Sequence, residues 1–105
     1  AINFQFLAKT FSEKIVPTSI KVSKAYPNPF NPLVSLFIES NIDKCFITSA
    51  IYDINGKLID SIFDGILGSE KMNLKWDASS YPAGVYIIYT NWIDGSHFQK
   101  ITLLK

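Results

Sequence analysis

Residues 45–63 read CFITSAIYDINGKLIDSIF, two runs of β-branched and aromatic residues with Asn55-Gly56 between them. Such runs bounded by turn residues predict strands, because β-branched and aromatic side chains fit a pleated, half-buried surface. Asn-Gly supplies the two positive-φ residues that a type I′ turn requires. We therefore predict a tight β-hairpin in which strands Cys45–Tyr52 and Lys57–Phe63 are joined by a type I′ turn.

The rest of the chain repeats this pattern of short apolar runs and turn residues. Asp94-Gly95 predicts a second tight turn of the same kind, and residues 64–69, which include Gly65 and Gly68, predict a looser loop. Turn signals at intervals of about 8–12 residues leave no room for crossover helices and favour an antiparallel β-sandwich. The predicted fold class is all-β, with seven antiparallel strands: Ile20–Ala25, Val34–Glu39, Cys45–Tyr52, Lys57–Phe63, Met72–Trp76, Val85–Trp92 and Phe98–Leu104.

The composition is that of one folded domain with few charges. The chain has 105 residues, of which 48% are hydrophobic and 18% charged, too apolar for a disordered chain. The net charge is +1 and every basic residue is Lys, which argues against a nucleic-acid partner. The single Cys45 excludes an intrachain disulfide and a Cys-based zinc site, so we expect a small core residue. With one histidine besides, His97, the sequence predicts neither metal nor cofactor.

The first residues differ from the rest of the chain. Ile2, Phe4 and Phe6 alternate with polar residues as in a short strand, and Lys9–Val16 resembles a linker exposed to proteolytic processing. We expect residues 1–17 to be a linker or the tail of a preceding domain, and residues 18–105 to be the domain itself. The start, Ala-Ile-Asn, shows no signal-peptide pattern, so we expect a fragment of a longer protein.

Candidate catalytic and metal-binding groups find little support in the sequence. His97 adjoins Ser96, but neighbours on a strand point to opposite faces, which rules out a direct Ser–His pair. Asp60, Asp64 and Asp77 stand at strand ends and turns, where Asp is common for structural reasons. The Asp53-x-Asn55-Gly56 pattern fails as a calcium loop, because the first and twelfth ligand positions would both be Ile. We predict that the chain is not an enzyme.

The aromatic residues of the second half have two interpretations. On the strand Val85–Trp92, neither set of alternate residues is cleanly polar, which indicates a central strand covered on much of both faces. Most aromatics are then core residues, and the residues next to turns, Tyr81 and Trp92, are the expected exceptions. The alternative is a row of exposed aromatics that stacks on sugar rings. The aromatics concerned are Trp76, Tyr81, Tyr86, Tyr89 and Trp92.

Prolines are concentrated between residues 26 and 32. Each Pro fixes its own φ and keeps the preceding residue extended, so we expect a stiff connector outside the sheets. Its Asn amides are expected to bond to nearby backbone, and its two aromatic residues to pack on the sandwich as anchors. A Pro-x-x-Pro ligand is the alternative, although such ligands are usually solvated tails. The residues are Tyr26, Pro27, Asn28, Pro29, Phe30, Asn31 and Pro32.

Gly84-Val85-Tyr86 stands at the start of the penultimate strand. A Tyr in this place is typical of the tyrosine corner of Ig-like sandwiches, in which its hydroxyl bonds back to the connecting backbone. The Cys pair of antibody domains is absent from the sequence. We therefore expect an Ig-like sandwich of another type.

Five blocks taken together resemble the C-terminal sorting domain, type A, of the type IX, or Por, secretion system. The resemblance covers about residues 20–105, and the same pattern is similar to the Ig-like domain of flagellar hook-capping proteins. In one respect the chain departs from the family, because residues 87–90 carry no basic residue where one is common. The blocks are residues 26–32, Ile51–Lys57, Trp76–Ala78, Pro82–Tyr86 and Lys100–Lys105.

The resemblance implies a seven-stranded Ig-like sandwich with a targeting function. Such domains direct an attached N-terminal cargo through the periplasm to the outer-membrane translocon and on to the cell surface or medium, and a sorting peptidase commonly removes them. The alternative is an accessory spacer or binding module, for example one that binds carbohydrate, in a secreted multidomain enzyme. The sequence leaves the oligomeric state open.

The recognition motif implied by the resemblance comprises residues from all parts of the domain. We expect main-chain groups at a sheet edge, together with the segment Lys100–Lys105, to form the surface by strand addition, with lysines protecting the edge meanwhile. Deletion of Ile101–Lys105 is then predicted to leave cargo in the periplasm. The motif residues are Tyr26, Pro27, Asn28, Pro29, Phe30, Asn31, Pro32, Asp53, Asn55, Gly56, Lys57, Gly84, Tyr86, Lys100 and Lys105.

Overall fold

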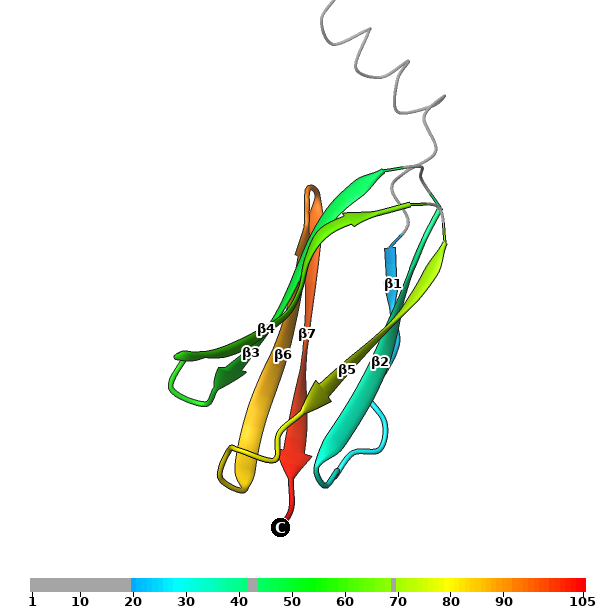
Figure 1. The fold of residues 1–105 in the computed structure, drawn as a ribbon. Coiled ribbons are helices and arrows are strands. Elements are labelled where there is room, and N and C mark those ends of the chain that lie inside the picture. Colours follow the sequence, from blue (N-terminus) through cyan, green and yellow to red (C-terminus); the bar gives the residue numbers. More distant parts are fainter. Residues whose placement is uncertain (1–19, 42–43, 69) are drawn as a thin grey trace, which may run out of the picture.

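The computed structural model describes residues 20–41, 44–68 and 70–105, and these form a sandwich of two antiparallel sheets (Figure 1). One sheet has the strand order β1-β2-β5 and the other the order β4-β3-β6-β7. The prediction of seven antiparallel strands is therefore confirmed. No helix in the described part of the chain has the length and apolar character needed to cross a membrane. The strands are β1 (Ile20–Val22), β2 (Leu33–Ser40), β3 (Cys45–Asp53), β4 (Leu58–Leu67), β5 (Lys71–Asp77), β6 (Gly84–Trp92) and β7 (Gly95–Leu103).

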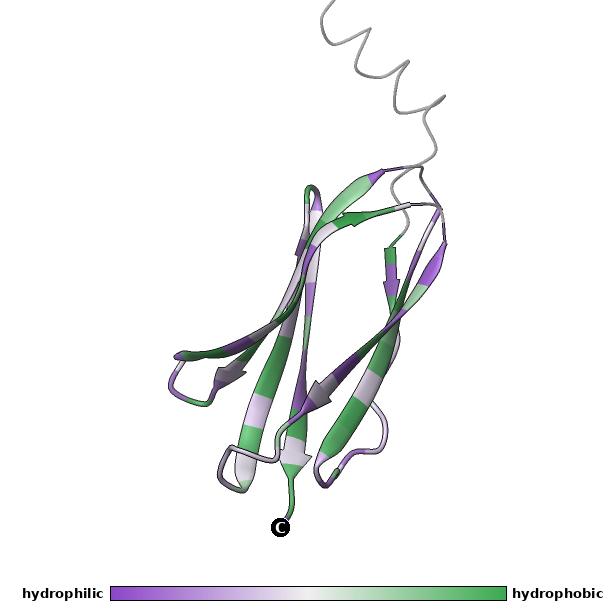
Figure 2. Ribbon diagram, viewed as in Figure 1, coloured by the Kyte–Doolittle hydropathy of each residue, from purple (hydrophilic) through white to green (hydrophobic). Residues whose placement is uncertain are grey.

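The core lies between the two sheets and follows from alternation along each strand. In β2, Val34, Leu36 and Ile38 are buried while their neighbours are more exposed, and Figure 2 shows that hydrophobic residues make up most of this strand. Strand residues alternate between faces, so every second side chain enters the core. Cys45 is buried in this core, as predicted. The predicted linker, residues 1–17, lies outside the described residues.

Strand β6 is central, as its two mixed faces predicted, because it pairs with β3 on one side and β7 on the other. Its inner face carries Tyr86, Ile88 and Thr90, all buried, while Ile87 and Tyr89 on the other face are half-buried. The hydroxyls of Thr90 and Ser49 share a buried hydrogen bond of 3.0 Å. This pairing satisfies two polar groups that would otherwise be costly inside the sandwich.

The hairpin between β3 and β4 is confirmed, but the predicted type I′ turn is wrong. The amide of Gly56 donates to the carbonyl of Asp53 at 3.0 Å, so Ile54 and Asn55 are the central residues of the turn. Gly56 follows them with φ of 84°, the arrangement of a three-residue loop. The Asp53 carboxylate accepts hydrogen bonds from the amides of Asn55 and Lys57, both at 2.9 Å. These two hydrogen bonds to the Asp53 carboxylate favour the three-residue loop over the two-residue type I′ turn.

The second hairpin is also shifted by one residue from its prediction. Trp92 pairs with Gly95, so Ile93-Asp94 rather than Asp94-Gly95 forms the loop. A Cβ atom on Gly95 would lie 2.9 Å from Nε1 of Trp92. The indole of Trp92 covers Gly95 at close range. A glycine is therefore needed here because it leaves room for the indole, and not because of a turn conformation.

The predicted loop over residues 64–69 is wrong, because β4 continues through it to Leu67. Asp64 pairs with Thr48, Gly65 with Ile47 and Ile66 with Phe46. The glycine that suggested a loop lies opposite Ile47 within the ladder. The neighbouring strand β3 overrides the weak local preference for strand.

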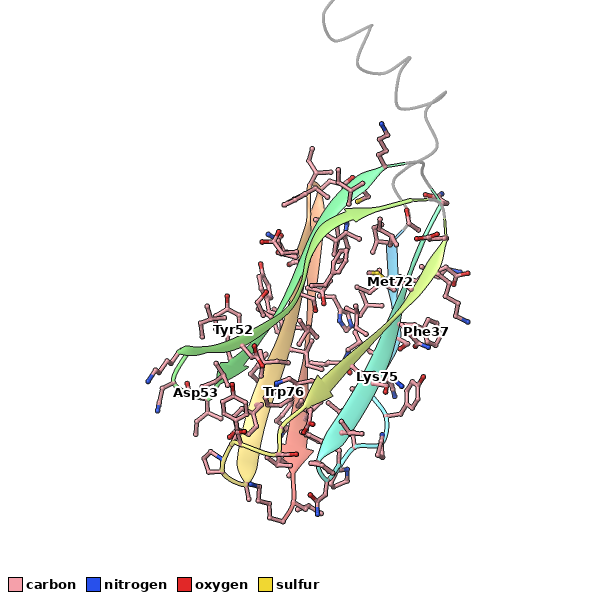
Figure 3. The ribbon with its side chains drawn as sticks, viewed as in Figure 1. Phe37, Tyr52, Asp53, Met72, Lys75 and Trp76 are labelled. Carbon is pink, nitrogen blue, oxygen red and sulfur yellow. The ribbon has the colours of Figure 1, made fainter. Side chains whose placement is uncertain are left out.

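The aromatic cluster between the sheets is centred on Trp76, which points inward from β5 in Figure 3. Its ring lies 5.9 Å from that of Phe30, 5.5 Å from that of Tyr81 and 5.3 Å from that of Tyr86. The indole N–H donates to Oδ2 of Asp60 at 3.0 Å. Trp76 and Tyr86 are thus core residues, as predicted, and Tyr81 and Trp92 are half-buried against the core.

The tyrosine corner is confirmed, since the Tyr86 hydroxyl donates to the carbonyl of Pro82 at 2.6 Å. Replacement of Tyr86 by Phe is expected to lower the free energy of unfolding by about 1–2 kcal/mol, because the partly buried hydrogen bond to the Pro82 carbonyl is lost. Urea unfolding of the two proteins measures this difference. An unchanged midpoint would show that the corner bond contributes nothing to stability.

The same pair of proteins gives a test against pH. Burial, and after it the charge of Asp53, raises the pKa of Tyr86 above its ordinary value. A raised pKa in the folded state gives stability that is complete below pH about 10 and is lost as pH rises through the folded value. The difference between the parent and Tyr86→Phe is therefore expected to be constant at neutral pH and to shrink above pH about 10.

Candidate functional site

Sequence blocks that are far apart in the chain meet at one end of the sandwich, which we call the C-terminal pole. It comprises residues 26–32, the 53–57 hairpin, residues 82–86 and residues 100–105. Three pairings join these blocks: Phe30 with Leu103, Gly84 with Leu103, and Asp53 with Tyr86. In Figure 1 the β3–β4 hairpin, the start of β6 and the end of β7 lie at this same end.

The proline-rich segment is bonded along the outer edge of β7. The amide of Phe30 donates to the carbonyl of Thr102, and the amide of Leu104 donates to the carbonyl of Phe30, both at 2.9 Å. Asn28 continues this seam with its side chain, donating to the carbonyl of Lys100 at 3.0 Å and accepting from the amide of Thr102 at 3.1 Å. The predicted bond of Asn28 to nearby backbone is wrong, because its partners lie more than 70 residues further along the chain.

Of the two predicted aromatic anchors, one is confirmed and one is wrong. Phe30 is 2% exposed and packs on Trp76, whereas the Tyr26 side chain is 48% exposed. The main chain of Tyr26 is nevertheless fixed, because it exchanges two hydrogen bonds with Ser35 at the start of β2. The segment is thus held on both sides by the sandwich, unlike the solvated tail that a Pro-x-x-Pro ligand requires.

Among the remaining prolines, Pro32 forms a main-chain hydrogen bond with the rest of the sandwich. The carbonyl of Pro32 accepts from the amide of Ala78 at 2.9 Å, which ties the segment to the end of β5. Pro27, Pro29 and Asn31 are exposed. The peptide bonds that precede Pro27, Pro29 and Pro32 are all cis.

The 53–57 hairpin and the 82–86 segment share a groove of about 300 Å³, which Asp53, Asn55, Tyr81, Gly84 and Tyr86 help to line. Lys57 is exposed at the hairpin. No three His, Cys, Asp or Glu side chains in the described parts of the chain are grouped so as to hold a metal ion. The Asp53 carboxylate, which accepts from the amides of Asn55 and Lys57, fixes the conformation of this hairpin.

Lys100 and Lys105 place positive charge on the surface of the pole. Lys105 donates from Nζ to the carbonyl of Ser79 at 3.1 Å, and Lys100 is exposed on β7 beside Asn28. Ser79 also bonds to Asp77. The hydrogen bonds from its hydroxyl and amide hold the pKa of the exposed Asp77 carboxyl below its usual value. The pole thus presents cationic groups on a main chain that is fixed by hydrogen bonds.

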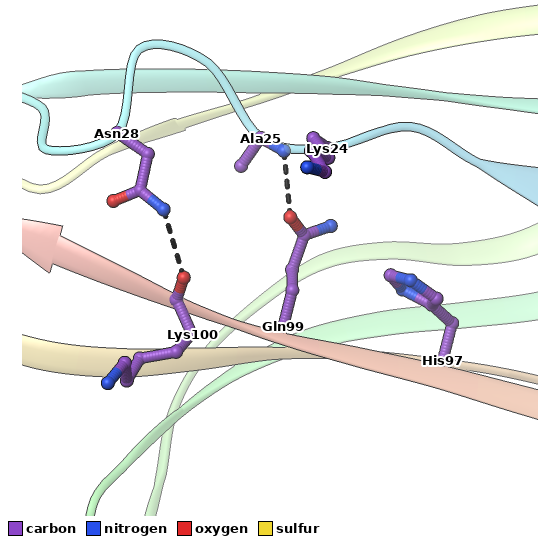
Figure 4. A pocket seen from close by; sticks show the side chains of 6 residues that line it. All are labelled: Lys24, Ala25, Asn28, His97, Gln99 and Lys100. Atoms are coloured by element: carbon purple, nitrogen blue, oxygen red, sulfur yellow. Dashed lines mark hydrogen bonds between the residues drawn. The ribbon is translucent and has the colours of Figure 1, made fainter.

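Above the seam, the proline-rich segment separates from β7 and a polar cleft opens (Figure 4). It has a volume of about 490 Å³ and is lined by Lys24, Ala25, Asn28, His97, Gln99 and Lys100. This cleft leaves no signal in the sequence, because it depends on which residues of β7 lie opposite residues 24–28. His97 itself lies on the edge strand β7, as expected.

Comparison with known proteins gives the family of the chain. The family model described as "Secretion system C-terminal sorting domain" matches residues 24–103. The chain belongs to this family. It is a type IX C-terminal sorting domain, a targeting module of secreted or cell-surface proteins, and the family is not a catalytic one. No curated protein matches the chain.

Two solved structures contain a region similar to this sorting domain. The first is dimeric latent PorU from Porphyromonas gingivalis, with a TM-score of 0.61 and 23% identity. The second is the β-glucosidase EmGH1 from Erythrobacter marinus, with a TM-score of 0.51 and 12% identity. These matches cover 86% and 83% of this chain, but only 10% and 16% of those chains. At such identities the two structures support the fold alone.

Proposed function

We propose that this sorting domain directs an attached N-terminal cargo from the periplasm through the outer-membrane type IX translocon, and that a surface peptidase then removes it. The observation that carries the proposal is the C-terminal pole, where four blocks of the family pattern meet on one folded surface. Separated blocks come together only in the native state, so a receptor for this surface distinguishes a folded from an unfolded sorting domain.

The pole contains buried residues that support it and exposed residues that a receptor can contact. Phe30 and Tyr86 are buried, so they support the surface from within. Lys57, Lys100 and Lys105 are exposed. We infer that these three lysines are the groups that a negatively charged receptor surface contacts, because charged groups at an interface steer encounter and fix register.

The alternative of a carbohydrate-binding module loses its main support. It required a row of exposed aromatics from Trp76, Tyr81 and Trp92, but Trp76 is 2% exposed and the other two pack against the core.

A plain spacer module is separated from a sorting module by the first experiment. That experiment is the intact mass of the parent protein recovered from the cell surface and medium. We expect a mass without this domain, with the break between about Lys9 and Ser23; a retained domain contradicts removal.

A second experiment tests which surface is read. A reporter with a periplasmic export signal is fused to the domain in a bacterium with a type IX system. The double variant Lys100→Glu, Lys105→Glu is expected to lower surface display about tenfold, while the matched control Lys21→Glu, Lys75→Glu on the other sheet does not. Thermal melts of both variants establish that they are folded. Equal display of the two folded variants would overturn the role of the pole lysines.

A further inference from the structure

The outer edge of β7 is open over its first half. Thr102 and Leu104 use their outward main-chain groups in the seam with the proline-rich segment, and the carbonyl of Lys100 accepts from the Asn28 side chain there. Outward groups alternate along an antiparallel edge strand, so those of Ser96 and Phe98 also point away from β6. Within the described ranges neither residue has a main-chain partner on that side. The seam therefore covers only the last part of this edge.

Beside this open edge, β7 is joined to residues 23–25 by hydrogen bonds from a side chain and not by main-chain pairing. Gln99 accepts from the amide of Ala25 at 2.8 Å and donates to the carbonyl of Ser23 at 3.0 Å. In Figure 4 Gln99 and Asn28 each reach across from one wall of the cleft to the other. Both walls are thus held in place while the strand edge stays exposed.

The charged side chains that line the cleft in the described part of the chain have one sign. Lys24 and Lys100 line it, and none of the described carboxylates does. His97 also lines it, and its Nδ1 is buried without a hydrogen-bond partner within the described structure. Beside the cleft, the Phe98 side chain is 67% exposed on the outer face and lies next to Tyr89, with 6.2 Å between ring centroids. The edge therefore combines free main-chain groups, an apolar ring and cations.

We propose that residues 96–98 of β7 accept an extended, acidic segment of a partner protein by strand addition. The main-chain groups of Phe98 pair with the added strand. Side chains of that strand alternate between its two faces, so an apolar residue packs on the Phe98 ring, a carboxylate on the same face meets Lys100, and carboxylates on the other face meet Lys24. Main-chain bonds supply affinity and the side chains supply selectivity. This inference deepens the proposed function by giving the chemistry of a partner, and it moves strand addition away from the Lys100–Lys105 edge, which the seam occupies.

The test uses the 105-residue chain and two capped peptides, Thr-Glu-Glu-Val-Glu-Glu-Thr, which places Glu on both faces beside a central Val, and the same sequence with Lys for each Glu. Titration followed by amide NMR is expected to shift the signals of residues 96–100 with the acidic peptide only. Lys24→Glu, Lys100→Glu is expected to weaken its binding about tenfold, as loss of two surface ion pairs implies. Lys21→Glu, Lys75→Glu is the matched control and is expected to bind normally. Shifts located elsewhere, or equal binding of both peptides, overturn the proposal.

A main-chain variant separates strand addition from simple charge attraction. Phe98→Pro removes the outward N–H, which the β6–β7 ladder does not use, and Pro is tolerated at such edge positions. We expect Phe98→Pro to abolish binding, while Phe98→Val, which keeps the N–H, binds within about threefold of the parent. If Phe98→Pro fails to fold, Ser96→Pro serves instead, because its N–H also points outward. Normal binding by a folded proline variant overturns strand addition. Because the titration needs no secretion, its failure leaves the export result, and hence the proposed function, standing.

Discussion

A chain that stops at Lys100 is expected to be unfolded. The deletion removes Ile101 and Leu103, which are 0% and 1% exposed. Loss of each such side chain costs about 2–5 kcal/mol, and the two together approach the roughly 5–15 kcal/mol that stabilise a typical domain. Phe30 also loses both of its main-chain partners on β7. Circular dichroism and amide NMR of the truncated chain measure the effect.

The matched control is Leu104→Ala, Lys105→Ala, which changes two exposed residues of the same segment. We expect this variant to melt within a few degrees of the parent. Retention of cargo by the deletion of Ile101–Lys105 therefore reports loss of the fold, and the lysine substitutions are needed to test recognition. A deletion variant with native NMR dispersion would contradict this account.

Replacement of Trp76 by Ala is expected to lower the free energy of unfolding by about 3–5 kcal/mol. The indole contacts three aromatic rings, so its removal leaves a cavity that the surrounding strands cannot close. Asp60 also loses the N–H that it accepts at 3.0 Å. Urea unfolding followed by circular dichroism measures the change, because Trp76 itself is an unsuitable probe in this comparison.

Trp76→Phe separates packing from the hydrogen bond. It keeps a ring against Phe30 and Tyr86 but has no N–H for Asp60, and we expect a loss of about 1–2 kcal/mol. A loss for Trp76→Phe as large as that for Trp76→Ala would mean that the bond to Asp60, not ring packing, stabilises this cluster.

The sequence predicted the strands well because their signals are local. The apolar run of β2 and the mixed faces of β6 are features of the strands themselves, and Tyr86 stands at a fixed distance from the start of its strand. These features are set by the period of the strand and by neighbouring residues. The family blocks likewise indicated which residues belong to the pole.

The errors fall where a distant partner decides the local structure. Gly65 suggested a loop, but pairing with Ile47 extends β4 through it. The Asn55-Gly56 turn was misassigned because the Asp53 carboxylate captures two amides. The bonds of Asn28 were missed since their partners lie on the last strand. None of these contacts leaves a periodic signal in the sequence.

The seam between residues 28–30 and 100–104 joins the first part of the domain to its last strand. Ribosomes deliver residue 30 long before residue 104, so the proline-rich segment has no edge to bond until β7 exists. A polypeptide broken off within β7 through premature termination or proteolysis cannot close the seam or complete the pole. The pole is therefore complete only in a chain whose last strand has been synthesised and is intact.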